Sequence, residues 1–125
     1  MAVTYTTAVK NARMTAVRDQ IDAGSGPGVL QIGTTGMGTV LIEVTLDDPS
    51  GTVTGGVLSL SNFPRSDTSA NATGTAAAAR IRDSSGTDVI TGLTVGLSAA
   101  DVILDSVNIT AGQTVTINTA AFTHA

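Results

Sequence analysis

Few residues in this chain are suited to acid–base or nucleophilic chemistry. There is one His, His124, which stands one residue from the end of the sequence, and there is no Cys. A nucleophile activated by a neighbouring base usually requires a His or a Cys inside the fold. The Asp and Glu residues are scattered through turns, and no two of them stand out as an acid–base pair. The sequence therefore predicts no catalytic residues and a protein that is not an enzyme.

Two acidic turns and one glycine-rich loop could bind ions. The segment Asp83–Asp88 and the Asp47-Asp48 pair offer oxygen ligands of the kind that Ca²⁺ takes, but neither has the spacing of a twelve-residue calcium loop. Asp and Ser before Gly are also ordinary turn residues. The loop Gly33–Thr39 resembles a phosphate loop in its glycines, but it lacks the Lys and lies between expected strands. We interpret all three as turns and predict no metal and no cofactor.

The composition predicts a core built from small aliphatic side chains. Apolar residues make up 42% of the 125-residue chain, but there is no Trp, one Tyr and two Phe. Because aromatic residues usually contribute much of the energy of a core, this core should be thin. Burial of further Leu and Val at a subunit interface would then stabilise the protein. We therefore expect a homo-oligomer, with a trimer as one form.

The charge of the chain narrows the classes of partner. The formal net charge is −4, which argues against nucleic acid or an anionic membrane as the main partner. No apolar run approaches the ~20 residues needed to cross a bilayer, and the first residues lack the features of a signal peptide. Three of the six basic residues, Lys10, Arg13 and Arg18, fall in one N-terminal segment. They are the candidate residues for binding an acidic partner.

One helix is expected, over Thr6–Ala23, with Thr6 or Thr7 as its N-cap. Arg18 and Asp22 lie four residues apart and are expected to pair. Gly24–Gly28 contains Gly and Pro and should end the helix. Four polar residues recur at helical spacing and form one stripe: Asn11, Thr15, Arg18 and Asp22.

Short strands separated by turn residues are expected along the rest of the chain. Before the C-terminal hairpin, they fall over Val29–Gly33, Thr39–Leu46, Gly56–Ser61, Ala76–Arg82, Val89–Val95 and Val102–Leu104. Residues 62–74 form the longest irregular stretch, and its length is typical of a functional or mobile segment.

Two hairpins are expected from alternation and turn chemistry. Folding Asp105–Thr119 about Gly112 sets Ile109 opposite Val115 and Val107 opposite Ile117, so that all four share one apolar face. In the earlier hairpin, setting Arg82 opposite Asp88 sets Ile81 opposite Val89, so charge pairing and burial favour the same register.

These elements predict a mainly β protein. The expected fold is an antiparallel β-sandwich of about seven or eight short strands with one N-terminal α-helix. Residues 1–28 would be a helical segment with a Gly/Pro linker and residues 29–125 the sandwich, in a single folding unit. No βαβ alternation is present, which argues against a parallel sheet.

Both ends of the chain resemble small structural proteins of tailed bacteriophages. The resemblance covers Thr6–Gly28, Gly92–Asp101 and Leu104–Ile117, about half of the chain. It implies a structural protein of the virion, assembled in the host cytoplasm, with the major capsid protein or another virion protein as its partner. The placement we favour is a decoration (cement) protein that binds the outside of the head and stabilises it.

Two alternatives remain open at this point. The chain could instead be a neck, tail or fibre component of the virion. It could also be a carbohydrate-binding or adhesin-like β-module, although such sites usually stack sugars on exposed aromatic residues and this chain has three aromatic residues in all.

Overall fold

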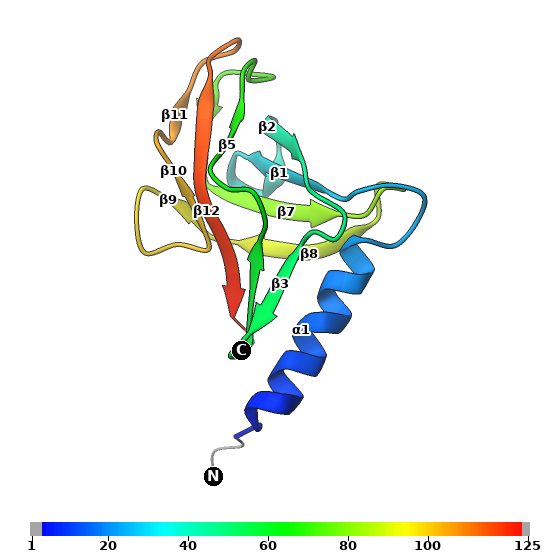
Figure 1. Cartoon of the computed structure of the whole chain (residues 1–125). Helices are drawn as coiled ribbons and strands as arrows, with labels where there is room; N and C mark the ends of the chain where they lie inside the picture. Colours follow the sequence, from blue (N-terminus) through cyan, green and yellow to red (C-terminus); the bar gives the residue numbers. More distant parts are fainter. Residues whose placement is uncertain (1–3, 124–125) are drawn as a thin grey trace.

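The computed structural model describes residues 4–123, which form mainly β-strands with one α-helix at the N-terminal end (Figure 1). The predicted fold class is confirmed at this level: the chain is mainly β, with one helix and antiparallel sheets. The strands are β1 (Val29–Gly33), β2 (Val40–Thr45), β3 (Gly51–Thr54), β4 (Val57–Leu60), β5 (Arg65–Asp67), β6 (Gly74–Thr75), β7 (Ala78–Arg82), β8 (Asp88–Leu93), β9 (Val95–Gly96), β10 (Val102–Leu104), β11 (Asn108–Ile109) and β12 (Val115–Thr123).

The helix α1 (Thr7–Ile21) begins where the sequence predicts, because Thr6 caps it. The Thr6 Oγ1 atom accepts a hydrogen bond from the Val9 N–H at 3.3 Å. Met14 and Ile21 are buried on one side of the helix, which contacts β3 and β4. In Figure 1 the helix runs alongside β3, and its N-terminal end points away from the four-stranded sheet.

The predicted pair between Arg18 and Asp22 is wrong. Arg18 pairs instead with Asp19, with 3.7 Å between Nη2 and Oδ1. Asp22 is engaged elsewhere, since both of its carboxylate oxygens accept hydrogen bonds from the Ser50 N–H, at 3.0 and 3.2 Å. A tertiary contact between the end of the helix and the turn before β3 therefore replaces the local pair.

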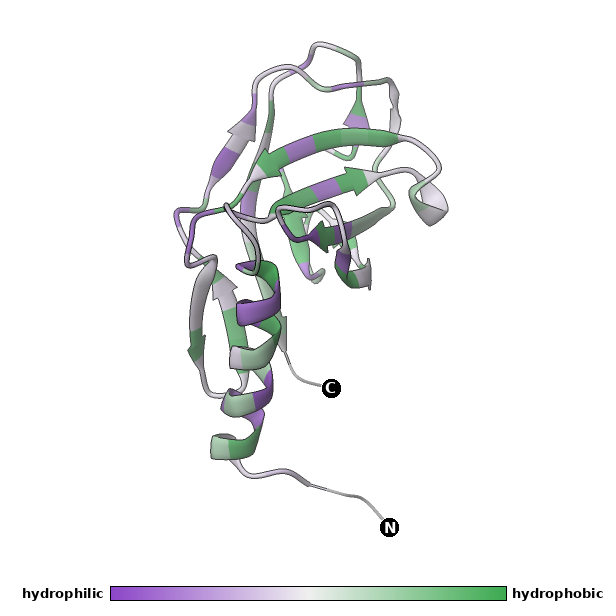
Figure 2. Cartoon of the chain, turned by 90° about the vertical axis from the view of Figure 1, so that its right-hand side faces the viewer, coloured by the Kyte–Doolittle hydropathy of each residue, from purple (hydrophilic) through white to green (hydrophobic). Residues whose placement is uncertain are grey.

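A four-stranded antiparallel sheet has the strand order β2-β1-β7-β8. Successive side chains of a strand point to opposite faces, so Leu30, Ile32 and Ile81 are buried on the inner face, while Gln31 and Arg80 lie on the outer face. This alternation is visible as green and purple bands along the strands in Figure 2. The sequence predicts β1 residue for residue.

The hairpin of β7 and β8 confirms part of its predicted register. Arg82 lies opposite Asp88, and Arg82 Nε lies 2.7 Å from Asp88 Oδ1. Ile81, however, lies opposite Ile90 and not Val89, because the register shifts between Ile81 and Arg82. A β-bulge of this kind adds a residue to one strand, and sequence alternation alone does not reveal it.

The six-stranded sheet is organised around β12, the longest strand. Its strand order is β3-β4-β12-β10-β9. The strand β5 also pairs with β12, along a different stretch of it from the one that pairs with β4. All of its pairs are antiparallel except the short parallel pair of β9 and β10. In Figure 1, β12 runs along the molecule, whereas β7 and β8 of the other sheet run across it.

The predicted C-terminal hairpin is wrong in its pairing. Gly112 does form a turn with φ +85°, and Ile109, Val115 and Ile117 are buried as expected. The two strands then part: β11 pairs with β6 in a separate two-stranded sheet, and β12 pairs with β10, β5 and β4. With neighbours along both of its edges, β12 satisfies more of its backbone groups than a hairpin partner alone would satisfy.

The predicted number of strands is too low, because several short strands lie in segments expected to be turns or irregular. One of them, β3, forms a hairpin with β4 through Gly55 and Gly56, whose φ angles are +60° and +78°. Two consecutive residues with positive φ are typical of a two-residue hairpin turn, and the Gly-Gly pair was the available signal in the sequence. The strand β5 lies inside the stretch 62–74, and β6 begins at its last residue, Gly74.

Candidate functional site

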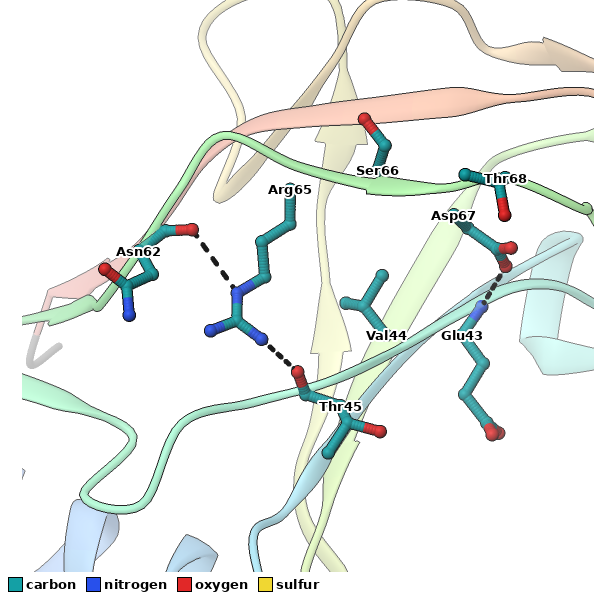
Figure 3. A pocket seen from close by; sticks show the side chains of 8 residues that line it. All are labelled: Glu43, Val44, Thr45, Asn62, Arg65, Ser66, Asp67 and Thr68. Carbon is teal, nitrogen blue, oxygen red and sulfur yellow. Dashed lines mark hydrogen bonds between the residues drawn. The ribbon is translucent and has the colours of Figure 1, made fainter.

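A cavity of about 500 Å³ lies where the edge strand β2 meets β5, and is called here the β2–β5 cavity. It is lined by residues 43–45 and 65–68 and by Asn62 (Figure 3). Three of these residues, Glu43, Arg65 and Asp67, are ionisable. A large concave site with convergent polar groups is the usual first candidate for a binding or catalytic site, so the partners of these groups decide what it can do.

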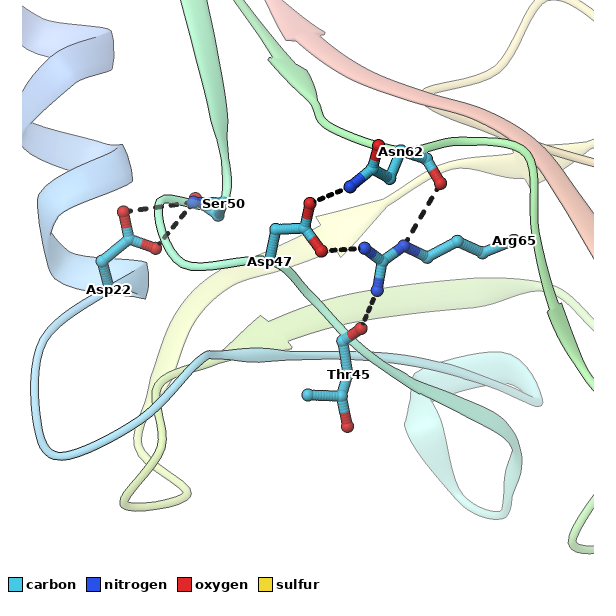
Figure 4. Close-up of polar contacts among 6 residues, drawn as sticks. All are labelled: Asp22, Thr45, Asp47, Ser50, Asn62 and Arg65. Atoms are coloured by element: carbon cyan, nitrogen blue, oxygen red, sulfur yellow. Dashed lines mark hydrogen bonds and ion pairs between the residues drawn. The ribbon is translucent and has the colours of Figure 1, made fainter.

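Arg65 uses each of its three guanidinium nitrogens in a hydrogen bond within the chain (Figure 4). Nε donates to the Asn62 carbonyl at 3.3 Å, and Nη1 donates to the Thr45 carbonyl on β2. Nη2 pairs with Asp47, which also accepts a hydrogen bond from the Asn62 amide. The guanidinium therefore holds β5, the turn after β2 and the end of β2 together.

Asp67 bonds to the middle of the free edge of β2. Its Oδ2 accepts a hydrogen bond from the Glu43 N–H at 3.1 Å, and its Oδ1 accepts one from the Ser69 N–H at 2.9 Å. Two residues earlier on β2, the Leu41 carbonyl accepts a hydrogen bond from the Asn71 N–H at 2.7 Å. Backbone groups of residues 41, 43 and 45 are thus bonded by the segment 65–71. An edge strand covered in this way does not offer its backbone to another strand.

The contact between Asp22 and Ser50 contains the one buried polar residue among the described residues, Ser50. Its N–H is bonded to Asp22, and its carbonyl accepts a hydrogen bond from the Ser61 N–H at 2.9 Å. Its side-chain Oγ is fully buried and has no hydrogen-bond partner within residues 4–123. Because the oxygen is enclosed, it is not accessible to a substrate.

The three basic residues predicted to bind a partner differ in their exposure. Lys10 lies against the body of the protein, next to Gly56. A Cβ added at Gly56 would be only 3.1 Å from the Lys10 Cβ. Arg18 is half-buried beside Asp19. Arg13 is exposed, and its Cζ lies 4.8 Å from the centre of the Tyr5 ring. Arg13 is the most accessible of the three, and partner binding stays a prediction for all of them.

The acidic turns and the glycine-rich loop form ordinary turn structure. Asp83 Oδ1 accepts hydrogen bonds from the Ser85 and Thr87 N–H groups at 2.9 and 3.0 Å, and Asp47 is bonded to Arg65 and Asn62. The loop contains the 3₁₀ turn η1 (Thr35–Met37). Over residues 4–123, no cluster of three or more His, Cys, Asp or Glu side chains is placed to hold a metal ion. His124 lies outside the described residues.

Sequence reasoning missed Arg65, and the residues around it carry no local signal. Its partners Thr45 and Asp47 precede it by 20 and 18 residues, so the cluster exists only once β5 meets β2. Arg80 was also missed, although it stands two residues before Arg82 on β7. That spacing places both arginines on one face of a strand, and this was the available signal.

Comparison with known proteins returns no match, whether to a family model, a curated protein or a solved structure. Within residues 4–123, no helix has the length and apolar character needed to span a membrane.

Proposed function

We propose that this chain is a non-enzymatic structural protein of a tailed-bacteriophage virion, and that it decorates the outside of the head. The proposal starts from the resemblance of residues 6–28 and of the C-terminal segments to small structural proteins of such phages. The major capsid protein is the proposed partner. We also propose that the two larger sheets form an irregular antiparallel sandwich, since both contribute buried residues to one core.

The observation that carries the non-enzymatic part of the proposal is the state of the β2–β5 cavity. A catalytic site keeps some ionisable groups able to bind a substrate or exchange a proton. In this cavity, Arg65 and Asp67 instead bond to backbone groups and to Asp47, and the Glu43 carboxylate accepts a hydrogen bond from the Gln31 amide. Side chains used in this way stabilise the fold, which supports a structural role over an enzymatic one.

The covered edge of β2 also bears on how the protein would dock. Addition of a partner strand at β2 would have to displace the bonds that residues 65–71 make to Leu41, Glu43 and Thr45. Docking through exposed side chains is then the simpler mode, and Arg13 is the exposed member of the basic helix residues. An acidic surface on the head would complement it.

The first experiment is a count of copies in purified particles from the source, by quantitative mass spectrometry against the major capsid protein. A ratio near one, or a fixed simple fraction of it, is expected for a protein that covers the shell. A few copies per particle would assign the chain to the neck, tail or fibres. Complete absence would overturn the virion proposal, and a binding module would then be the leading alternative.

The docking step has its own test, the variant Arg13→Glu. We expect its occupancy on particles to fall at least about tenfold, because charge reversal turns an attraction into a repulsion. The matched variant Arg13→Lys keeps the charge and should retain most of the occupancy. Since Arg13 is exposed, neither change should alter the free energy of unfolding by more than about 0.5 kcal/mol. Unchanged occupancy of Arg13→Glu would exclude docking through this residue.

A further inference from the structure

A second cavity, of about 390 Å³, lies on the outer face of the four-stranded sheet and is called here the outer-face cavity. Its walls come from three elements: Met37 of η1, Ala78 and Arg80 of β7, and Asp88 and Gly92 of β8. Much of this lining is apolar, since it includes Met37, Ala78 and glycine backbone. Arg80 and Asp88 are its only charged residues.

Arg80 differs from Arg18, Arg65 and Arg82 in the use of its guanidinium. Its Nε donates to the Gln31 Oε1 atom at 2.8 Å. Within residues 4–123, its two terminal nitrogens make no hydrogen bond, and no carboxylate lies within ion-pair distance. By contrast, Arg18, Arg65 and Arg82 each pair with an Asp.

The other charged residue of the cavity does not neutralise Arg80. Asp88 is bonded through Oδ1 to Arg82, with 2.7 Å between Nε and Oδ1. Arg80 and Arg82 lie on one face of β7, and the two carboxylates on this face of the sheet, Asp88 and Glu43, are bonded to Arg82 and to Gln31. Within residues 4–123, Arg80 therefore has no ion-pair partner, and its guanidinium lies at the wall of a partly apolar cavity.

A row of side chains across three strands holds Arg80 in position. Gln31 of β1 lies between Glu43 of β2 and Arg80 of β7 in the sheet register. The Gln31 amide donates from Nε2 to Glu43 Oε2 at 2.6 Å and accepts from Arg80 Nε at 2.8 Å. Both ends of the Gln31 amide are thus engaged, which fixes the Nε edge of the guanidinium and leaves the opposite edge available.

We propose that the outer-face cavity binds a carboxylate carried on a short aliphatic chain. A guanidinium with two unengaged terminal nitrogens matches the two oxygens of a carboxylate in parallel hydrogen bonds. The aliphatic part of the ligand would contact Met37 and Ala78. The volume is at the small end of the range for ligand pockets, and a group of a few carbon atoms fits it. The carboxylate could belong to a free small acid or to a Glu side chain of a partner protein.

The test is an NMR titration of the ¹⁵N-labelled full chain with glutarate, and with the uncharged analogue glutaramide as the control ligand. We expect saturable shifts of the Arg80 Nε–H signal and of the Met37 and Gly92 amide signals with glutarate only. Acetyl-Gly-Glu-Gly-amide provides the second arm. Tighter binding of this peptide would identify a protein side chain as the source of the carboxylate, and binding of glutarate alone would identify a small acid.

Three variants separate binding at this cavity from a general attraction of anions. Arg80→Gln should abolish the saturable shifts, whereas Arg13→Gln, which removes an exposed arginine on the helix, should leave them unchanged. Gln31→Ala should weaken binding about threefold, because it frees the Nε edge of Arg80. The amide spectra of the variants report whether each one folds. Shifts that never saturate, that persist in Arg80→Gln, or that glutaramide reproduces would overturn the proposal.

Discussion

Arg65 and Arg80 are the same residue type in two cavities of similar size, but their guanidinium groups are bonded to different extents. Arg65 lies in the β2–β5 cavity with Nε, Nη1 and Nη2 all bonded within the chain. Arg80 lies in the outer-face cavity with only Nε bonded. Cavity size alone does not separate these two sites. What distinguishes the two is whether the charged group has donors that the fold leaves unused.

The largest effect on stability is expected from Arg65→Met. This variant leaves the Thr45 carbonyl and the Asp47 carboxylate without their partner at a junction between two sheets. We expect the free energy of unfolding to fall by about 2–3 kcal/mol, as for loss of a partly buried charged group with several bonds. Urea denaturation measures it. Arg80→Met is the matched control and should change stability by less than about 0.5 kcal/mol. Equal losses in both variants would remove the distinction between the two arginines.

A smaller loss is expected from Asp67→Ala, which frees the Glu43 N–H at the middle of the β2 edge. Two N–H groups, those of Glu43 and Ser69, lose their acceptor, and we expect a cost of about 1–2 kcal/mol. Because the uncovered edge can pair with another chain, the variant should also self-associate on warming, which light scattering detects. The control is Asp88→Ala, which breaks an exposed pair with Arg82 and should cost at most about 1 kcal/mol without association. A fully monomeric, stable Asp67→Ala protein would contradict the proposed protection of the edge.

The smallest effect is expected at Ser50, whose side chain is neither bonded nor accessible. Its Oγ is buried without a partner, so Ser50→Ala should raise the free energy of unfolding by about 0.5–1 kcal/mol. Thermal denaturation checks the sign. The control Ser66→Ala removes a hydroxyl that bonds to Thr116 Oγ1 at 2.9 Å and should lower stability slightly. A clear loss of stability in Ser50→Ala would show that its hydroxyl has a partner, such as a bound water molecule.

The sequence predicts local features of the fold well. Alternation predicts β1 and most of β2, Thr6 marks the start of the helix, and the Arg82–Asp88 pair fixes one end of a hairpin. Each of these depends on residues within a few positions of one another. The C-terminal pairing fails because β12 pairs with β10, which precedes the expected hairpin, and with the distant strands β4 and β5, in place of the nearby segment β11.

The candidate sites are less predictable than the strands, for a related reason. The bonds of Arg65 require β5 to meet β2, and nothing in residues 62–74 indicates that meeting. The position of Arg80 on the outer face of the sheet follows from its place in a strand. The cavity, however, also requires η1 to lie beside β7 and β8. The basic helix residues were predicted from their closeness in sequence, whereas helix geometry places Lys10 and Arg18 toward the body and leaves Arg13 exposed.

On our proposal, the fold uses the guanidinium of Arg65 and leaves that of Arg80 available for a ligand. Hydrogen exchange of the terminal guanidinium N–H groups, followed by ¹⁵N NMR on the arginine-labelled chain, tests it most directly. We predict that the terminal hydrogens of Arg65 exchange at least about tenfold more slowly than those of Arg80, since only the former are bonded. Equal rates, or slower exchange at Arg80, would contradict the claim.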